Sequence, residues 1–324
     1  MAHQFPRVNS TRRLRSLFLW ASAILLASAL ALAAYWHFWW RRPPGTGPVA
    51  LPVPAESFSQ PWTERRVLLV GLGDSVTAGF GAAKGRSYFD RLAGPSAADE
   101  YPELRGLNLR AVLPNLSITN LSVSGSTSLQ HVRQQLPRLT RQHPDTLGII
   151  VLTTGGNDLI HNYGRTEPSE GALFGATVAQ AAPWVTNFAV RLGQMIATIT
   201  NQFPGGAHVF LADIYDPTDG LGDIGRAGPL PDWPDGLALH TEFNRIIRDF
   251  AGRHGNVHLV PMHRAFLGHG IHCTQFWREH YAAADPHYWF HDNLEDPNDR
   301  GYDAIRRLFL REIAAVLGPR PEAR

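Results

Sequence analysis

Residues 67–79 read VLLVGLGDSVTAG, a short apolar run followed by glycine, aspartate and serine. A continuous apolar run of this length is typical of a strand buried on both faces of a parallel sheet. Ser75 then stands where the strand gives way to a helix, near the free N–H groups and positive potential of the helix N-terminus. Both would stabilise an oxyanion that develops there. Helix capping by Asp74 or Ser75 explains the same residues, because these residue types prefer the N-cap position.

The chain beyond residue 64 alternates between short apolar runs and longer amphipathic stretches. The short runs predict buried strands at residues 67–72, 117–123, 148–153, 208–214 and 257–260. Apolar residues at helical spacing predict helices at residues 179–203, 237–254 and 301–317. This alternation indicates an α/β fold in which a parallel five-stranded sheet has helices on both sides. Ligands of such sheets bind beyond the carboxyl ends of the strands.

Two further strand ends carry residues suited to a site at that edge. The second strand leads into SVSGST, residues 122–127, where Gly125 permits a close backbone approach and can present its N–H to a ligand. The third leads into TTGGND, residues 153–158, where Asn157 offers amide donors. Turns favour glycine, serine and asparagine in any case, so each segment alone is a weak signal. Their convergence with Ser75 on one edge predicts a functional site.

Together these segments resemble the SGNH/GDSL hydrolases, a family named for four blocks that each supply one catalytic residue. Blocks one to three match at Ser75, Gly125 and Asn157, in the family's order, and the resemblance extends over residues 66–317. It implies a flavodoxin-like three-layer α/β/α sandwich. It also implies that Ser75 attacks an ester carbonyl, while its own N–H, the Gly125 N–H and the Asn157 amide form the oxyanion hole. Acyl transfer of this type needs no cofactor.

The fourth block departs from the family, which carries Asp-x-x-His-Pro-Asn before the last helix, with histidine as the base and aspartate orienting it. Here residues 291–302 read HDNLEDPNDRGY. Without a gap, Asp296 takes the place of the histidine and Asn293 that of the aspartate. A serine needs a base near neutral pKa to be a good nucleophile. Asp296 is a weak base unless burial or a neighbouring acid such as Glu295 raises its pKa.

A histidine elsewhere would also serve as the base. His291 is the nearest and our first candidate, with Asp296 second, and Glu295 would orient His291 if the loop forms a helical turn. Each of the other histidines, taken alone, is explained by a packing or surface role. They are His161, His258, His263, His269, His272, His280 and His287.

A metal site is the other reading of this histidine-rich region. His269, His272 and Cys273 are ligand types, but their spacing matches no zinc pattern. Cys273 is the only cysteine, so no disulfide forms within the chain. We therefore expect no metal and no cofactor.

The N-terminal region predicts a membrane anchor. Residues 17–40 hold no Lys, Arg, Asp or Glu, and a helix of that length crosses a hydrocarbon core of roughly 30 Å. A cleaved signal peptide is the alternative. The length of the run and its aromatic end, suited to a membrane–water interface, favour retention. Four arginines precede the run and two follow it, which predicts a single-pass protein whose large domain faces the periplasm or exterior.

Charge argues against a nucleic-acid partner. Residues 1–42 hold six arginines and no acid, so the remaining chain carries −4 of the net charge of +2. A mildly acidic domain lacks the clustered positive charge that nucleic-acid binding needs. We expect a cytoplasmic N-terminus at residues 1–16 and a transmembrane helix at residues 17–40. A stiff Pro-rich tether without material for a core follows at residues 41–63. The hydrolase-like domain covers residues 64–318, and a tail covers residues 319–324.

The resulting hypothesis is a serine hydrolase at the outer side of the membrane. It would cleave an ester, thioester or acyl-sugar bond in a small-molecule, lipid or acylated-glycan substrate. The insertions at residues 161–175 and 217–235 would shape its pocket. The alternative is a catalytically silent domain that binds an envelope glycan or lipid, which the departed fourth block favours.

Overall fold

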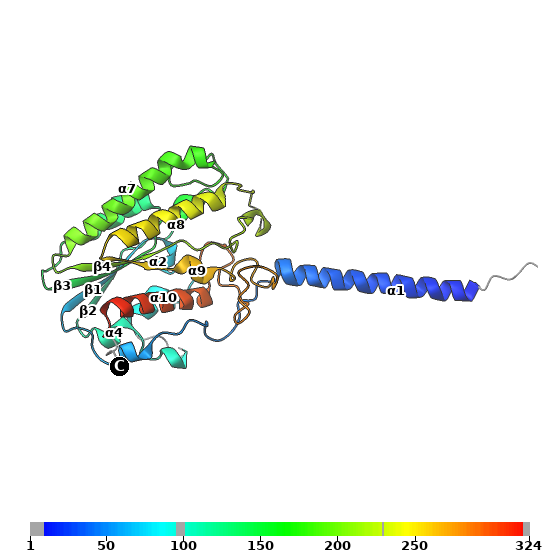
Figure 1. Cartoon of the computed structure of the whole chain (residues 1–324), viewed down its shortest axis with the longest axis horizontal. Helices are drawn as coiled ribbons and strands as arrows, with labels where there is room; N and C mark the ends of the chain where they lie inside the picture. The colour runs from blue at the N-terminus through cyan, green and yellow to red at the C-terminus, as the bar shows by residue number, and fades with distance from the viewer. Residues whose placement is uncertain (1–9, 95–100, 229, 320–324) are drawn as a thin grey trace, which may run out of the picture. The chain divides into compact units, whose positions relative to one another are not determined.

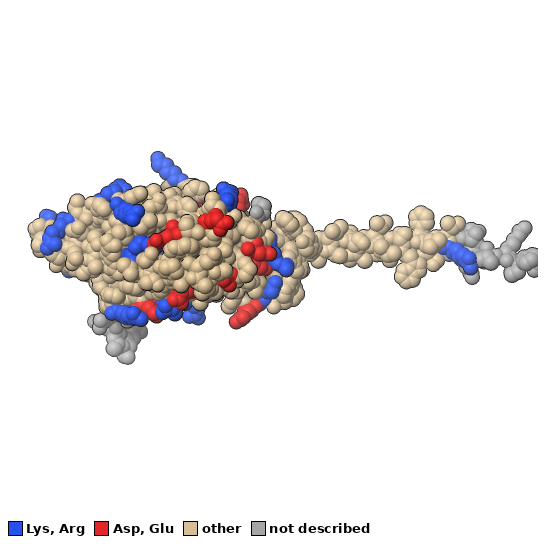
Figure 2. All heavy atoms as spheres, turned by 90° about the horizontal axis from the view of Figure 1, so that it is seen from above, with Lys and Arg blue, Asp and Glu red and all other residues tan. Residues whose placement is uncertain are grey.

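The computed structural model describes residues 10–94, 101–228 and 230–319, and the chain divides into two units, Met1–Arg42 and Pro43–Arg324. The first unit is helix α1 (Ser10–Tyr35), which continues into a π-helical turn, η1 (Trp36–Trp40). Arg13–Trp40 is long and apolar enough to cross a membrane, although a signal sequence near an N-terminus has the same properties. Figure 2 shows almost no charged side chains along this helix except near its N-terminal end. Residues 1–9 and 320–324 of the expected terminal segments lie outside the described residues.

The second unit is built around the predicted parallel sheet. Its strands are β1 (Arg66–Leu72), β2 (Leu116–Asn120), β3 (Thr146–Leu152), β4 (Ala207–Ala212) and β5 (Val257–Val260), in the order β2-β1-β3-β4-β5 (Figure 1). β1 and β3 form the centre, with Leu69 paired to Ile149. This is the flavodoxin-like strand order. The fold class predicted from the sequence is therefore confirmed.

Helices cover both faces of the sheet because successive strand residues point to opposite sides. Leu69 and Ile149 face one core, which also contains side chains from α3 (Tyr88–Ala93), α4 (Leu109–Val112) and α10 (Asp299–Leu317). Val70 and Ile150 face the other core, beneath α7 (Val178–Gln202) and α8 (Gly236–Arg253). Figure 1 shows these two layers with the sheet between them. Short helices follow individual strands: α2 (Ser75–Ala78), α5 (Ser128–Gln130), α6 (Gly156–Ile160) and α9 (Met262–Phe266).

The Pro-rich segment differs from the expectation of a tether without material for a core. Val49 is only 4% exposed and belongs to the core beneath α10. Arg300, near the start of α10, donates from Nη1 to the Gly47 carbonyl at 2.5 Å and from Nη2 to the Pro48 carbonyl at 3.2 Å. Arg307 donates to the Leu51 carbonyl at 3.2 Å. Prolines hold the segment extended, and its exposed carbonyls then accept from arginines that the sequence places more than 200 residues away.

Removal of this segment should destabilise the folded unit. A chain of residues 64–324 loses the burial of Val49, worth roughly 1.5–3 kcal/mol, and leaves Arg300 without its carbonyl partners. Its thermal midpoint should lie roughly 5–10 °C below that of a chain of residues 43–324. Circular dichroism on the two chains measures the difference, and equal midpoints would contradict the docking of this segment.

Candidate active site

Ser75 is the first residue of α2, directly after the turn that follows β1. Gly73 in that turn has φ +133°, and a Cβ there would lie 2.3 Å from the Thr153 carbonyl oxygen, so only glycine fits. Asp74 is the N-cap: it accepts from the Val76 N–H at 3.1 Å and from the Thr153 hydroxyl at 2.8 Å. Because Asp74 performs the capping, the half-buried Ser75 hydroxyl is not used for the cap.

The other two sequence-predicted donors follow β2 and β3. Asn157 is the second residue of α6, is buried, and donates from Nδ2 to the Ser126 carbonyl at 3.0 Å. Gly125, the neighbour of Ser126, is exposed in a left-handed turn with φ +78°. Ser75 and Asn157 line one cavity, and the Asn157–Ser126 hydrogen bond ties the turn of Gly125 to it. Gly125 itself is not among the residues that line the cavity.

A buried polar network behind these turns was missed by the sequence reasoning. Gln135 accepts from the Gly73 N–H at 2.9 Å and donates to the Gly73 carbonyl at 2.7 Å, and the Ser126 hydroxyl donates to the same carbonyl at 3.0 Å. His131 contacts Ser126 Oγ and Thr154 Oγ1, each at 3.0 Å. Burial lowers the pKa of His131 to about 3, so this histidine is neutral and structural. No sequence motif marks Gln135 or His131.

The fourth block brings Asp296 to Ser75. Asn293 donates from Nδ2 to Asp296 Oδ2 at 2.7 Å. Burial raises the pKa of Asp296, and the nearby Ser75 hydroxyl and the Asn293 amide offset part of that rise. Oδ1 of Asp296 is buried and has no partner at normal hydrogen-bond distance, so the contact with Ser75 is looser than the bond from Asn293. Catalytic hydrogen bonds are often long without substrate.

His291, our first candidate for the base, is placed differently. Its ring packs edge-on against Phe80, with 6.3 Å between centroids, and a Cβ on Gly81 would lie 3.1 Å from it. Its backbone N–H donates to the Asp296 carbonyl at 2.7 Å, while Nδ1 is buried without a hydrogen-bond partner. The expected pairing with Glu295 does not form: the Glu295 carboxylate accepts from the Tyr163 hydroxyl instead. Asp296, and not His291, therefore occupies the position next to Ser75.

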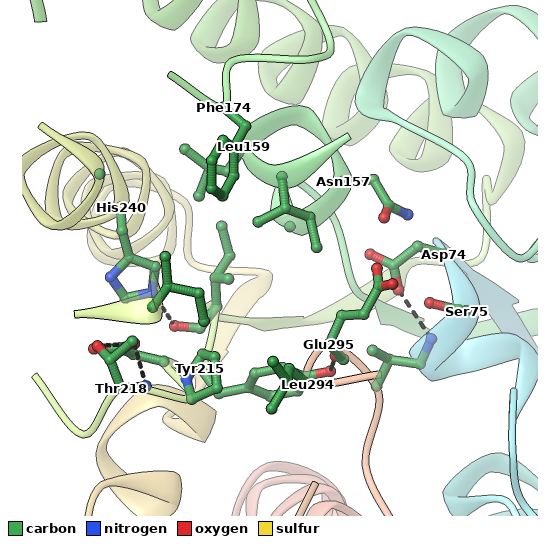
Figure 3. A pocket seen from close by; sticks show the side chains of 18 of the residues that line it. Asp74, Ser75, Asn157, Leu159, Phe174, Tyr215, Thr218, His240, Leu294 and Glu295 are labelled. Carbon is green, nitrogen blue, oxygen red and sulfur yellow. Dashed lines mark hydrogen bonds between the residues drawn. The ribbon is translucent and has the colours of Figure 1, made fainter. Parts of the chain in front are cut away.

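Three carboxyl groups gather around the serine. Burial raises the pKa of Asp74 to about 6, and the charge of Asp296 adds to the shift. Burial is also the main cause that raises the pKa of Asp296 and that of Glu295. Figure 3 shows Asp74, Ser75 and Glu295 on one side of the pocket, with Asn157 nearby. A carboxylate with a raised pKa is a stronger base than an exposed one, which is what a serine nucleophile requires.

The remaining histidine candidates have structural explanations. The His269 ring stacks on Trp289 at 3.5 Å between centroids, and its Nδ1 lies 3.0 Å from the His287 carbonyl. His272 pairs with Asp223 at 3.0 Å. His161 is exposed. Among the described residues, no group of three or more His, Cys, Asp or Glu side chains is arranged to hold a metal ion.

An apolar cavity of about 150 Å³ extends from Ser75 along the carboxyl ends of β3 and β4. Figure 3 shows His240 and Thr218 at its end opposite Ser75, with apolar side chains between. Both insertions line it. They contribute Tyr163, Phe174, Pro217, Thr218, Gly222, Ile224, Leu230 and Trp233. His240 Nε2 lies 2.9 Å from the Ile214 carbonyl, so this histidine closes the far end and is not beside the serine.

The fold and these strand-end residues identify the class of protein. Residues 72–304 match the model of the GDSL-like Lipase/Acylhydrolase family, and the chain belongs to that family. Membership supports the hydrolysis of ester bonds in general. Among curated proteins, none matches the chain.

Solved structures of similar fold include esterases and lipases. An extracellular lipase from Streptomyces rimosus is 18% identical with a TM-score of 0.46, covering 78% of this chain and 98% of its own. A catalytic variant of an acetylxylan esterase from Geobacillus stearothermophilus is 17% identical with a TM-score of 0.46, covering 78% and 94%. A lipase from a goat rumen metagenome is 15% identical with a TM-score of 0.48, covering 75% and 95%.

The raised pKa of Asp74 predicts a specific dependence of stability on pH. Its folded pKa of about 6 exceeds the roughly 3.9 of an unfolded aspartate, so the folded state binds more protons between these values. Stability should therefore fall as pH rises through this window and stay low above it. Asp74→Asn removes the buried charge while its amide oxygen still accepts from Val76. The variant should match the wild type near pH 4 and exceed it by about 3 kcal/mol above pH 7.

Urea unfolding at a series of pH values measures this difference. Asp145→Asn is the matched control, because the Asp145 side chain is 80% exposed. A stability difference for Asp74→Asn that does not change with pH would show that Asp74 carries no raised pKa.

Proposed function

We propose that the chain is a serine esterase in which Ser75 is the nucleophile, Asp296 the general base and Asn293 the residue that orients the base. The observation that carries this proposal is the position of Asp296: its Oδ2 accepts from Asn293 at 2.7 Å, its buried Oδ1 has no hydrogen-bond partner, and the carboxylate lies near the Ser75 hydroxyl. The family's serine, histidine and aspartate thus correspond to Ser75, Asp296 and Asn293. Aspartate replaces the family's histidine at position 296, and asparagine replaces its aspartate at position 293. The base still lies between the serine and the residue that orients the base.

The chemistry follows the usual acyl transfer. Asp296 takes the Ser75 proton as Oγ attacks the ester carbonyl, and the N–H groups of Ser75 and Gly125 with the Asn157 amide stabilise the oxyanion. Asp296 then gives the proton to the leaving alcohol. Asp296 next takes a proton from a water, which attacks the acyl carbonyl. The bond from that carbonyl to Ser75 Oγ breaks, the carboxylic acid product leaves, and Asp296 returns the proton to Ser75. Asn293 cannot accept the proton, so its amide holds the carboxylate in place through Oδ2 and leaves Oδ1 for Ser75.

In this proposal the N-terminal unit anchors the enzyme in a membrane. Arg13–Trp40 is retained as an anchor, and the arginine excess before it keeps the N-terminus in the cytoplasm. The catalytic unit then faces the periplasm or exterior. Substrates are lipid or acylated-glycan esters of that compartment, and no cofactor takes part.

Substitutions at the fourth block distinguish the two candidate bases. Asp296→Asn should lower kcat for a p-nitrophenyl ester by roughly 100-fold or more, since general base catalysis contributes about that much. His291→Gln is the matched control and should change kcat little. Asn157→Ala should also cost on the order of 100-fold, through loss of an oxyanion donor. The reverse ranking of Asp296→Asn and His291→Gln would assign the base to His291.

The pH profile provides an independent check on the base. Activity should rise with pH through the pKa of a buried carboxyl group, which lies above the 3.8 of a free aspartate. The double variant Asn293→Asp with Asp296→His restores the family's residues, and its profile should move to the ~6.5 of a histidine. If neither protein hydrolyses any ester while both remain folded, the silent binding domain becomes the better description.

The size of the cavity predicts the preferred acyl chain. A cavity of about 150 Å³ accommodates a group of the size of benzene, which corresponds to a short acyl chain. Each added methylene should raise kcat/KM about fourfold until the cavity is full, at roughly 0.8 kcal/mol per buried CH₂. Ile160→Phe narrows the cavity, so it should lower kcat/KM for the hexanoate ester and leave kcat/KM for the acetate ester nearly unchanged. Val190→Phe, on the exposed face of α7, should change kcat/KM for neither ester. Equal effects of the two substitutions would contradict the placement of the acyl chain.

A further inference from the structure

Two aromatic side chains are exposed on the long irregular segment between α9 and α10. Phe276 is 64% exposed and Trp277 is 44% exposed, and their rings pack edge to face at 5.0 Å between centroids. Neither lines the cavity beside Ser75. The proposed hydrolysis therefore does not account for their position.

The backbone that precedes the aromatic pair is held by several hydrogen bonds. Asp219 accepts from the N–H groups of Gly268 at 2.8 Å, Gly270 at 2.8 Å and His272 at 3.0 Å. His272 is itself bonded through Nε2 to Asp223. Many backbone hydrogen bonds to one buried carboxylate fix a loop whose residues form no helix or strand. The aromatic pair therefore projects from a rigid base.

The same segment holds the start of the folded unit. The Tyr288 N–H donates to the Pro43 carbonyl at 2.7 Å, and the His287 ring lies against Gly45. Figure 1 shows the loops of this segment gathered around the first residues of the unit. Pro43 is three residues beyond Trp40, the end of the apolar helix, and three residues span at most about 11 Å. An inserted anchor therefore brings residues 287 and 288 of this segment within reach of the membrane surface, and leaves the approach of the aromatic pair to be set by its own contacts.

The chemistry of the pair fits a bilayer better than a protein partner. Tryptophan and phenylalanine are suited to the boundary between headgroups and acyl chains, where Trp in particular is enriched. Two aromatic side chains present roughly 300–500 Å² at most, below the ~800 Å² per partner of a stable protein interface. Arg278, which follows the pair, bonds to Gln275 at 2.9 Å and places a positive charge beside it.

We propose that Phe276 and Trp277 insert into the membrane interface and form a second contact between the folded unit and the bilayer. This inference rests on the retained anchor of the proposed function. A second contact with the bilayer would fix the orientation of the folded unit at the membrane surface. Asp219 and Asp223 tie the aromatic segment to the loop that supplies Pro217, Thr218 and Gly222 to the cavity wall. That wall is thereby held next to the lipid from which acyl substrates would come.

Fluorescent labels on the full chain test this contact. The buried Cys273 is replaced by alanine, and single cysteines are introduced at Glu279, which is exposed beside the aromatic pair, at Val190 on α7 and at Leu25 in α1. Each labelled chain is reconstituted in phosphatidylcholine nanodiscs that contain spin-labelled lipid. We expect strong quenching of the label at position 25 and at position 279, and none at position 190. Phe276→Ser with Trp277→Ser should abolish quenching at position 279 and leave that at position 25 unchanged.

The outcomes separate the anchor from the second contact. If the label at position 25 is quenched and the label at position 279 is quenched no more than that at position 190, the aromatic contact is overturned and the anchor remains. Absence of quenching at position 25 overturns the anchor and the contact together. Unchanged quenching at position 279 in the double serine variant overturns the role of the aromatic pair.

Discussion

The close approach of Gly73 to Thr153 is the constraint on which the site depends. A side chain at Gly73 would lie 2.3 Å from the Thr153 carbonyl oxygen, so the ends of β1 and β3 come together only because this residue has no Cβ. Gln135 and Ser126 then bond to both polar groups of the Gly73 backbone and bring the turn after β2 to the same point. The turns that follow β1, β2 and β3 are thereby tied together at one glycine, and the Asn157 amide adds a bond to the Ser126 carbonyl. In the proposed mechanism these turns supply the nucleophile and its oxyanion donors.

The fourth turn supplies a carboxylate where the family has an imidazole. An aspartate in water is too weak a base for serine, but burial raises the pKa of Asp296, and that of Asp74 nearby to about 6. Asn293 is consistent with this change, because an amide can donate to a carboxylate, whereas a second aspartate there would repel it. The two departures from the family pattern therefore fit one another physically. Buried acids of this kind reduce stability, which active sites commonly tolerate.

Much of the fold could be predicted because its signals are local. The five strands are apolar runs bounded by turn residues, and the three long helices show apolar residues at helical spacing, so their positions differ from the structure by only a few residues. The position of Ser75 at a strand-to-helix turn was predictable because strand, turn and helix follow one another within a dozen residues. Gln135 and His131 were not, because their contacts join residues with no shared pattern. The docking of Val49 and the packing of His291 against Phe80 likewise depend on distant partners.

Reaction with a fluorophosphonate probe tests the central claim most directly, because such probes modify only serines made nucleophilic by their surroundings. Mass spectrometry of the digested protein locates the adduct, and the account predicts a single adduct on Ser75. Asp296→Asn should slow its formation by roughly 100-fold, while His291→Gln should leave the rate nearly unchanged. A folded wild-type protein in which Ser75 stays unmodified would contradict the assignment of this serine as an activated nucleophile.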